Sequence, residues 1–215
     1  ESQGGLAETK SALIGKPELL LFKTGPFDPA QGVPAETAFG ATELRDRSQG
    51  VLHYIVQFSC SPGEKERKLL DSVGARVLYY IPNNAYLVLA DASRIGPLEF
   101  APEVRSAFRL PKFVKVDPAL TPGEDRAVEL VATPGADLSP AAARLAKLFP
   151  RAGFISSAYH HRGGRVICTV RSADIASFMD EASGMEDVLS ILPWEEKLLL
   201  NDNSIWGIQN YATPH

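Results

Sequence analysis

The sequence predicts an α+β fold made of two tandem ferredoxin-like domains, preceded by an irregular N-terminal strap. Three observations lead to this prediction. Residues 51–117 follow the order β-α-β-β-α-β, residues 126–200 follow the same order, and residues 118–125 between them have the Pro, Gly and acidic composition of a linker. Two successive units with one pattern indicate an internal repeat, although few identical residues support it.

Composition narrows the classes of function. A chain of 215 residues with 45% apolar residues can form the cores of two small domains. The net charge is −4 and Lys and Arg are scattered, so we expect no nucleic-acid partner. No apolar run approaches the length needed to cross a bilayer, so we expect no membrane partner. The chain starts at Glu1 rather than Met, which fits a processed chain that has lost a signal peptide.

The first fifty residues show little periodicity. Residues 1–15 are small and polar, and we expect a loose arm there. Residues 18–23 predict a short buried strand or a hydrophobic plug. Residues 24–50 are rich in Gly, Pro, Ala and Thr, so we expect an irregular strap in which Phe27 and Phe39 pack, with disorder as the alternative.

In the first unit, residues 54–60 predict a strand and residues 65–73 predict a helix. Ser61 is the expected N-cap, Pro62 the expected first helical residue, and Gly74 the expected helix end. The remaining strands are expected over residues 76–81, 85–90 and 104–110, with a tight turn at 82–84 and a short helix at 93–100.

The second unit repeats this order. We expect strands over residues 128–132, 154–159, 165–170 and 188–194, and helices over residues 139–149 and 173–182. Ser139 is the expected N-cap of the first helix, and Gly163 and Gly164 suit a hairpin turn. The second helix should turn Ile175, Phe178 and Met179 toward the core.

The sequence offers no constellation of catalytic or metal-binding residues. It lacks the glycine-rich phosphate loop, the Gly-x-Ser-x-Gly elbow and the Cys-x-x-Cys pair of a zinc site. His160 and His161 could form a weak metal site, but a solvated loop is favoured because no carboxylate lies at ligand spacing. Cys60 and Cys168 are interpreted as two buried free cysteines, with one disulfide between the domains as the alternative.

The stretch from residue 194 to residue 207 changes character quickly. An acidic pair, Glu195 and Glu196, follows the last strand, and an apolar run that ends at Leu200 comes next. A polar cluster begins at Asn201. Adjacent residues on an extended chain point to opposite sides, so helix capping or a salt bridge suits the pair better than shared proton transfer. We interpret the Leu200–Asn201 bond as a boundary between two parts of the chain. We expect the part before this bond to assist the part that follows it.

On these residues the chain resembles the propeptide region and the extreme mature N-terminus of a secreted subtilisin-like serine protease. Propeptides of that family are ferredoxin-like domains whose last strand ends in an acidic pair and continues as a tail in the protease cleft. Residues 194–196 match the strand end and acidic pair, and residues 197–200 match the tail. Residues 201–209 are similar to the start of the large calcium-stabilised alkaline subtilases. The resemblance covers residues 51–215 and is best over 188–209, but the simplest family members have one such domain and a longer tail.

The resemblance implies a function for the propeptide. It would act as an intramolecular chaperone and as a cleft-occupying inhibitor of a subtilisin-like endopeptidase, and autoproteolysis would remove it near the Leu200–Asn201 bond. The tail would bind the cleft by strand addition, with Leu200 in the first specificity pocket. The residues of this cleft-binding tail are Lys197, Leu198, Leu199 and Leu200.

The resemblance also implies partners. The expected partner is the cognate subtilisin-like catalytic domain, in cis or as a separate chain, and its Asp, His and Ser are expected beyond His215. Glu195 and Glu196 would cap the N-termini of helices on the protease surface. Asp202 could join a calcium site of the protease part, whereas the propeptide itself needs no cofactor.

A different class of function fits the same repeat. A tandem ferredoxin-like regulatory module could bind a small ligand between its two domains and would also lack catalytic groups. A non-enzymatic interaction module is a third possibility. The residues that follow His215 in the gene would discriminate, because a protease needs an Asp-x-Gly strand, a His-Gly helix and a Gly-x-Ser helix.

Overall fold

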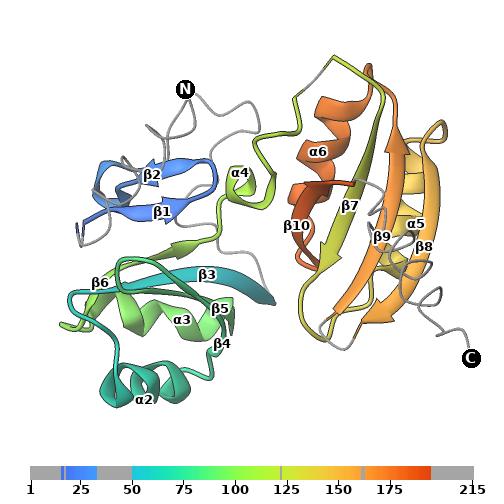
Figure 1. The fold of residues 1–215 in the computed structure, drawn as a ribbon. Coiled ribbons are helices and arrows are strands. Elements are labelled where there is room, and N and C mark those ends of the chain that lie inside the picture. The colour runs from blue at the N-terminus through green and yellow to red at the C-terminus, as the bar shows by residue number, and fades with distance from the viewer. Residues whose placement is uncertain (1–15, 17, 33–49, 122, 161–162, 195–215) are drawn as a thin grey trace, which may run out of the picture.

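The computed structural model describes residues 16, 18–32, 50–121, 123–160 and 163–194. They form an N-terminal hairpin and two four-stranded antiparallel sheets (Figure 1). In each sheet the first and third strands of the unit pair in the middle, and the second and fourth strands form the edges. This is the ferredoxin-like arrangement, so the predicted fold class is confirmed. No helix in the described ranges is long and apolar enough to span a membrane.

The first domain follows the predicted order. Its elements are β3 (Val51–Phe58), α2 (Glu64–Ser72), β4 (Arg76–Ile81), β5 (Ala85–Asp91), α3 (Ala92–Ile95), the 3-10 helix η2 (Gly96–Phe100) and β6 (Val104–Arg109). The strands are ordered β4-β5-β3-β6, and the hairpin turn places Asn83 and Asn84 at φ of 68° and 67°. Asn tolerates this left-handed region, so the predicted turn is confirmed.

The start of α2 differs from the prediction. The N-cap is Gly63 rather than Ser61, because the backbone N–H of Gly63 donates to Glu66 Oε2 at 2.7 Å. Glu66, at the third helical position, thus caps the helix by reaching back to residue 63. A predicted start two residues later would have placed this glutamate three positions after the N-cap. At the other end Gly74 has a φ of 70°, which confirms the predicted glycine stop.

An N-terminal hairpin covers the first sheet on the side opposite its helices (Figure 1). Its strands are β1 (Leu20–Phe22) and β2 (Gly25–Phe27), followed by the 3-10 helix η1 (Pro29–Gln31). Leu20 and Phe27 are buried against Ile55, Leu87 and Phe108 of the sheet. The expectation of an irregular strap from residue 24 is therefore wrong for β2, whereas Phe39 lies outside the described residues.

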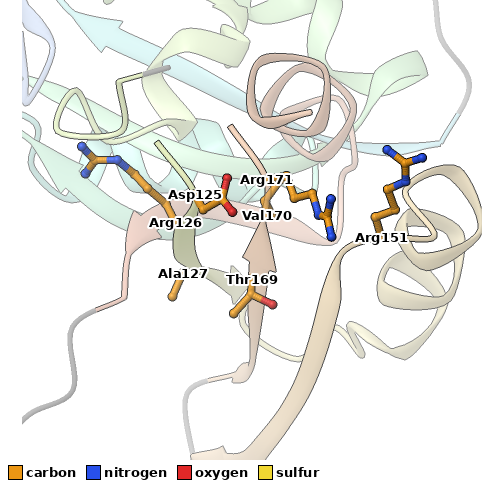
Figure 2. Close-up of a pocket in the computed structure, with 7 residues that line it drawn as sticks. All are labelled: Asp125, Arg126, Ala127, Arg151, Thr169, Val170 and Arg171. Carbon is orange, nitrogen blue, oxygen red and sulfur yellow. The ribbon is translucent and has the colours of Figure 1, made fainter. Parts of the chain in front are cut away.

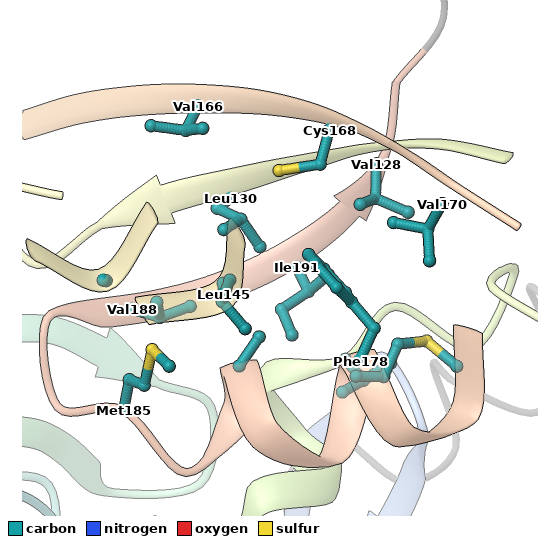
Figure 3. Close-up of a cluster of buried hydrophobic side chains, with 14 of the residues drawn as sticks. Val128, Leu130, Leu145, Val166, Cys168, Val170, Phe178, Met185, Val188 and Ile191 are labelled. Atoms are coloured by element: carbon teal, nitrogen blue, oxygen red, sulfur yellow. The ribbon is translucent and has the colours of Figure 1, made fainter. Parts of the chain in front are cut away.

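The second domain has the same architecture. Its elements are β7 (Arg126–Ala132), α5 (Ser139–Leu148), β8 (Gly153–His160), β9 (Gly163–Val170), α6 (Ile175–Ser183) and β10 (Val188–Pro193), with the strand order β10-β7-β9-β8. Ile175, Phe178 and Met179 are fully buried, which confirms the predicted inner face of α6. They pack with residues of β7, β9 and β10 in one core (Figure 3). Ser139 is the first residue of α5 rather than its cap, and its N–H and hydroxyl donate to Asp137 Oδ1.

The two cysteines are free and differ in environment. Cys168 lies in the core of the second domain, where burial raises the pKa of its thiol to about 12. Cys60 is exposed at the end of the first strand of its domain. The interpretation of two buried free cysteines is thus correct for Cys168 and wrong for Cys60, and no disulfide joins the domains.

A short helix connects the two domains. α4 (Lys112–Lys115) follows β6, and Val116 then forms a parallel bridge with Ile191 of β10. The N–H of Asp117 donates to the carbonyl of Ile191 at 2.9 Å, so the chain after α4 runs along one edge of the second sheet. Lys23, between β1 and β2, forms an ion pair with Asp117, which ties the hairpin to this connection.

Candidate functional site

Five polar residues form a partly buried cluster where the two domains meet, which we call the domain clamp: His53, Arg109, Lys115, Thr133 and Glu186. Its centre is Glu186, in the turn between α6 and β10. Arg109, at the end of β6, donates from Nη2 to Glu186 Oε1 at 2.6 Å. His53 of β3 lies with its Nδ1 3.1 Å from Glu186 Oε2, and because a carboxylate only accepts, Nδ1 carries the proton there.

His53 also contacts Thr133, which follows β7. Its Nε2 lies 3.0 Å from Thr133 Oγ1, and that hydroxyl donates to the backbone carbonyl of Glu186 at 2.9 Å. The order carboxylate–imidazole–hydroxyl is the order of a nucleophilic triad. However, His53 is 1% exposed and Thr133 4% exposed, and the only hydroxyl hydrogen of Thr133 is directed to a carbonyl. No substrate can reach this hydroxyl, so the cluster holds the domains together rather than performing catalysis.

The charged groups of the domain clamp shift each other's pKa values. Burial by itself would raise the pKa of Glu186, but the hydrogen bonds from His53 and Arg109 and the charges of Lys115 and Arg109 lower it to about 2. Burial lowers the pKa of Lys115 to about 8, although the Glu186 charge acts in the opposite direction. Lys115 is 4% exposed, and its ammonium donates to the carbonyl of Met185 at 2.9 Å. The fold therefore keeps Glu186 ionised and makes Lys115 easier to deprotonate than an exposed lysine.

Further contacts surround the domain clamp. Lys112 Nζ lies 2.8 Å from Asp180 Oδ1 of α6, and Arg76 of β4 donates to the carbonyl of Pro134 at 2.8 Å. A register shift in β10 leaves Leu189 without a partner in β7, and Leu189 packs against the apolar cluster beneath the N-terminal hairpin. A bulge of this kind redirects one side chain away from its sheet. Polar and apolar contacts thus fix the second sheet relative to the first.

The second sheet has a face that the helices do not cover, which we call the open face. Its residues, assigned by strand alternation from the buried residues of the same strands, are Ala127, Glu129, Val131, Arg165, Ile167, Thr169, Leu192 and Trp194. None of them belongs to any of the three buried core clusters in the described part of the chain. Glu129 and Arg165 form an ion pair at 2.7 Å, and the remaining side chains are mainly apolar.

The corresponding face of the first sheet is closed. Ile55, Leu87 and Phe108 on that face are buried under β1 and β2. Two sheets with one topology thus differ in what lies on their outer side (Figure 1). The outer face of the second sheet is therefore partly exposed, whereas that of the first sheet is covered.

The open face ends where the described chain ends. The N–H of Trp194 donates to the carbonyl of Ala127 at 3.0 Å, one step beyond the last pair of β10 with β7. Trp194 is 37% exposed. A large amphipathic side chain thus lies at the border of the open face, immediately before the segment for which the sequence predicts the cleft-binding tail.

A small pocket lies at the same end of the second sheet (Figure 2). It measures about 270 Å³, and we call it the arginine pocket; its lining residues are Asp125, Arg126, Ala127, Arg151, Thr169, Val170 and Arg171. In Figure 2, Arg151 and Arg171 lie on one side of Asp125 and Arg126 on the other. Three arginines and one aspartate line the pocket, but the Arg126 guanidinium points away from Arg151 and Arg171 in Figure 2 and lies 3.5 Å from Glu124. The positive charge of the pocket therefore comes mainly from Arg151 and Arg171, which are exposed. The pocket is suited to bind a carboxylate or another oxyanion.

The predicted site residues are mostly outside the described part of the chain. The acidic pair Glu195 and Glu196, the tail residues Lys197, Leu198, Leu199 and Leu200, the cleavage residue Asn201 and the calcium candidate Asp202 all lie there. These predictions therefore remain predictions. The prediction for His160 and His161 also remains a prediction, because the structure describes neither side chain.

Sequence reasoning missed the domain clamp. A histidine within the apolar run of β3 was the one available signal, since a polar residue in a buried strand needs a partner. The partner Glu186 is 133 positions away, so no local pattern could identify it. In the ranges that the structure describes, no group of three or more His, Cys, Asp or Glu side chains could hold a metal ion.

Comparisons with known proteins add little about function. A family model described as a domain of unknown function (DUF8729) matches residues 21–111, which comprise most of the N-terminal hairpin and the first domain. No curated protein gives a significant match. Among solved structures, the small subunit of acetolactate synthase from Thermotoga maritima is similar at 14% identity and a TM-score of 0.21, over 66% of this chain and 91% of that one. A match at this TM-score carries no argument about a shared role, so the family to which the chain belongs stays open.

Proposed function

We propose that this chain comprises the propeptide of a secreted subtilisin-like serine endopeptidase and the first residues of its catalytic domain. The propeptide assists folding of the protease and then inhibits it. The observation that carries the proposal is the open face of the second sheet, which leads at Trp194 directly into the segment that resembles a cleft-binding tail.

In this function the open face docks on the protease surface. The apolar side chains Val131, Ile167 and Leu192 would be removed from water, and the pair of Glu129 and Arg165 would lie among them. Residues 197–200 would then add as a strand to the substrate cleft, and cleavage would follow Leu200. Two contact regions on one rigid support give affinity without a large loss of entropy.

The chaperone function follows from the same contacts. A propeptide that binds the native-like protease and not its unfolded chain stabilises the folded state in proportion to RT ln(1 + [L]/Kd). In cis the effective concentration is high, because the tail joins the two parts directly. The domain clamp supports this function by fixing the orientation in which the open face is presented. The expected calcium ligand Asp202 belongs to the protease part and does not enter these steps.

A small ligand between the two domains, the competing function, would need space that the domain clamp and Leu189 occupy in the described residues. His53, Lys115 and Thr133 are buried there by protein atoms rather than arranged around a cavity. The interface thus favours a structural role, and we retain the propeptide function as the conclusion.

The test is an inhibition assay with the cognate catalytic domain and the separately produced chain ending at Leu200. We expect inhibition at a modest molar excess, and we expect Ile167→Asp on the open face to weaken it at least about tenfold, as for a residue near the centre of an interface. The matched control is Val77→Asp, since Val77 is an exposed strand residue of the first domain. Full protease activity with excess wild-type chain, or equal inhibition by both variants, would show that the proposal is wrong.

A further inference from the structure

We propose that His53 is a doubly protonated, positively charged imidazolium in the folded chain, and that its second proton makes the domain clamp a pH-sensitive latch between the two domains. The proposal concerns the charge of one buried side chain and the effect of losing that charge on the contact between the two sheets. It needs no partner molecule, so it can be tested independently of the proposed function.

The hydrogen bonds around the ring require a hydrogen on each of its nitrogens. Nδ1 lies 3.1 Å from Glu186 Oε2, and a carboxylate only accepts, so Nδ1 carries one proton. Nε2 lies 3.0 Å from Thr133 Oγ1, and that hydroxyl lies 2.9 Å from the backbone carbonyl of Glu186. A carbonyl also only accepts, so it takes the single hydroxyl hydrogen of Thr133, and Nε2 must supply the hydrogen of its own contact. An imidazole that donates from both nitrogens is positively charged.

A neutral ring would leave one acceptor without a hydrogen. With a proton on Nδ1 alone, Nε2 and the Glu186 carbonyl would compete for the one hydroxyl hydrogen of Thr133. His53 is 1% exposed and Thr133 is 4% exposed, so bulk water does not replace the missing donor. Leaving a buried polar group unsatisfied costs stability, and the charged ring avoids this cost.

Charged groups from several elements surround the ring. The carboxylates are Glu186 and Asp187 between α6 and β10, and the cations are Arg109 of β6, Lys115 of α4 and Arg76 of β4, whereas β5 places the uncharged Leu89 opposite His53. The cations oppose a further positive charge. However, Arg109 contacts the other oxygen of Glu186, Oε1, and the Lys115 ammonium donates to the carbonyl of Met185. The carboxylate in direct contact with the ring therefore dominates, because Coulomb energy falls with distance.

Loss of the second proton weakens the latch. The hydrogen bonds run from Nε2 of His53 to Thr133 and on to the backbone of Glu186, so they join the first sheet to two segments of the second domain. Without the proton this series is broken, and the Glu186 carboxylate loses a positive partner. The folded chain then binds more protons than the unfolded chain, so stability falls as the pH rises. The fall begins above about pH 6, where histidines of an unfolded chain start to lose their protons.

The direct test is 15N NMR of the imidazole nitrogens in the full chain of 215 residues, with His53→Gln used to identify the signals of His53. We expect both nitrogens to carry a proton at pH 7, where an exposed histidine is mostly neutral. Thr133→Val keeps the shape of the side chain but removes the acceptor of Nε2, so the ring should lose its proton about one pH unit lower. Thr133→Ser keeps the hydroxyl and should restore the wild-type behaviour.

The matched control is Thr121→Val, because Thr121 is an exposed threonine of the linker, and it should change nothing. A wild-type ring with a proton on Nδ1 alone at pH 7 would overturn the proposal. Equal shifts in Thr133→Val and Thr121→Val would overturn it too, since they would show that the hydroxyl does not hold the second proton.

Urea unfolding measures the effect on the latch. The equilibrium constant for unfolding of the wild type should rise about tenfold between pH 6 and pH 8, relative to His53→Gln. Because His160, His161 and His215 are present in both proteins, the difference reports His53. The same pH dependence in both proteins would contradict the latch. If His53→Gln does not fold, Thr133→Val compared with Thr133→Ser gives the same test, and the valine variant should show the smaller rise.

Discussion

His53 Nδ1 and Glu186 Oε2 lie 3.1 Å apart across the boundary between two domains of the same topology. The imidazole belongs to the first strand of the first sheet, and the carboxylate precedes the last strand of the second sheet. His53 is buried in this contact. Arg109 adds a hydrogen bond to Glu186, and Thr133 adds a contact with His53. Polar contacts with this degree of burial make the relative placement of the domains part of the fold, because either partner left alone would be unsatisfied.

The first prediction concerns Glu186→Gln. The variant loses the charge that Arg109 and His53 contact, so we expect the free energy of unfolding at pH 7 to fall by about 2 kcal/mol, the range for hydrogen bonds to charged groups. Urea unfolding measures the change. The matched control is Glu181→Gln, whose partner Arg144 is exposed, and it should cost less than about 1 kcal/mol. Equal effects of the two substitutions would contradict the role of the domain clamp.

The same variant should alter the acid limb of stability. The pKa of Glu186 is lowered from 4.5 to about 2 in the folded chain, so between these values the unfolded chain binds more protons. Its contribution is therefore fully present above about pH 4.5 and is lost as the pH falls toward 2. The loss is at most about 3 kcal/mol. Urea unfolding at a series of pH values should give a shallower acid limb for Glu186→Gln than for the wild type.

The second prediction concerns Lys115→Met and stability at alkaline pH. The pKa of Lys115 is lowered from 10.5 to about 8, so the unfolded chain binds more protons between these values, and the wild type gains stability as the pH rises through this window. Methionine removes the buried ionisable group, and we expect this rise to disappear. The control Lys68→Met, on an exposed lysine paired with Glu64, should keep it. An unchanged slope in Lys115→Met would show that the pKa of Lys115 is not lowered in the folded chain.

The third prediction tests the N-terminal hairpin. Phe27 is buried, and its ring centroid lies 5.7 Å from that of Phe108 and 6.1 Å from that of Phe113. Phe27→Ala should lower the free energy of unfolding by about 3 to 5 kcal/mol, the usual range for a buried aromatic. Phe100→Ala, at a site 85% exposed, provides the control and should change it little. A small loss at Phe27 would mean that the hairpin is not an integral part of the first domain.

The fourth prediction concerns the two cysteines. Cys60 is exposed, whereas Cys168 is buried with its thiol pKa raised to about 12, so a thiol reagent at pH 8 should label one cysteine per native chain and two in urea. Cys60→Ser should abolish labelling of the native chain, and Cys168→Ser should leave it unchanged. Slow labelling of Cys168 in the native chain would instead report opening of the second domain.

Local signals predicted the fold, and long-range contacts limited the prediction of the site. Helix periodicity placed Phe178 and Met179 in the core, Gly74 ended its helix, and Asn83 and Asn84 marked a turn. These features depend on neighbours within a few positions. The hairpin partner of β1 was missed because Gly25–Phe27 is too short to show alternation. The domain clamp was missed because its members come from both domains, and charge alone does not indicate which residues meet.

The N-terminal hairpin has a consequence for valency. A chain built from two ferredoxin-like units would present two similar outer sheet faces, and could then bridge two partner molecules or a second copy of itself. β1 and β2 close one of these faces, so under the proposed function we expect one partner molecule for each chain. Loss of the hairpin would expose Ile55, Leu87 and Phe108 on an apolar surface, and we expect such a chain to self-associate through that surface.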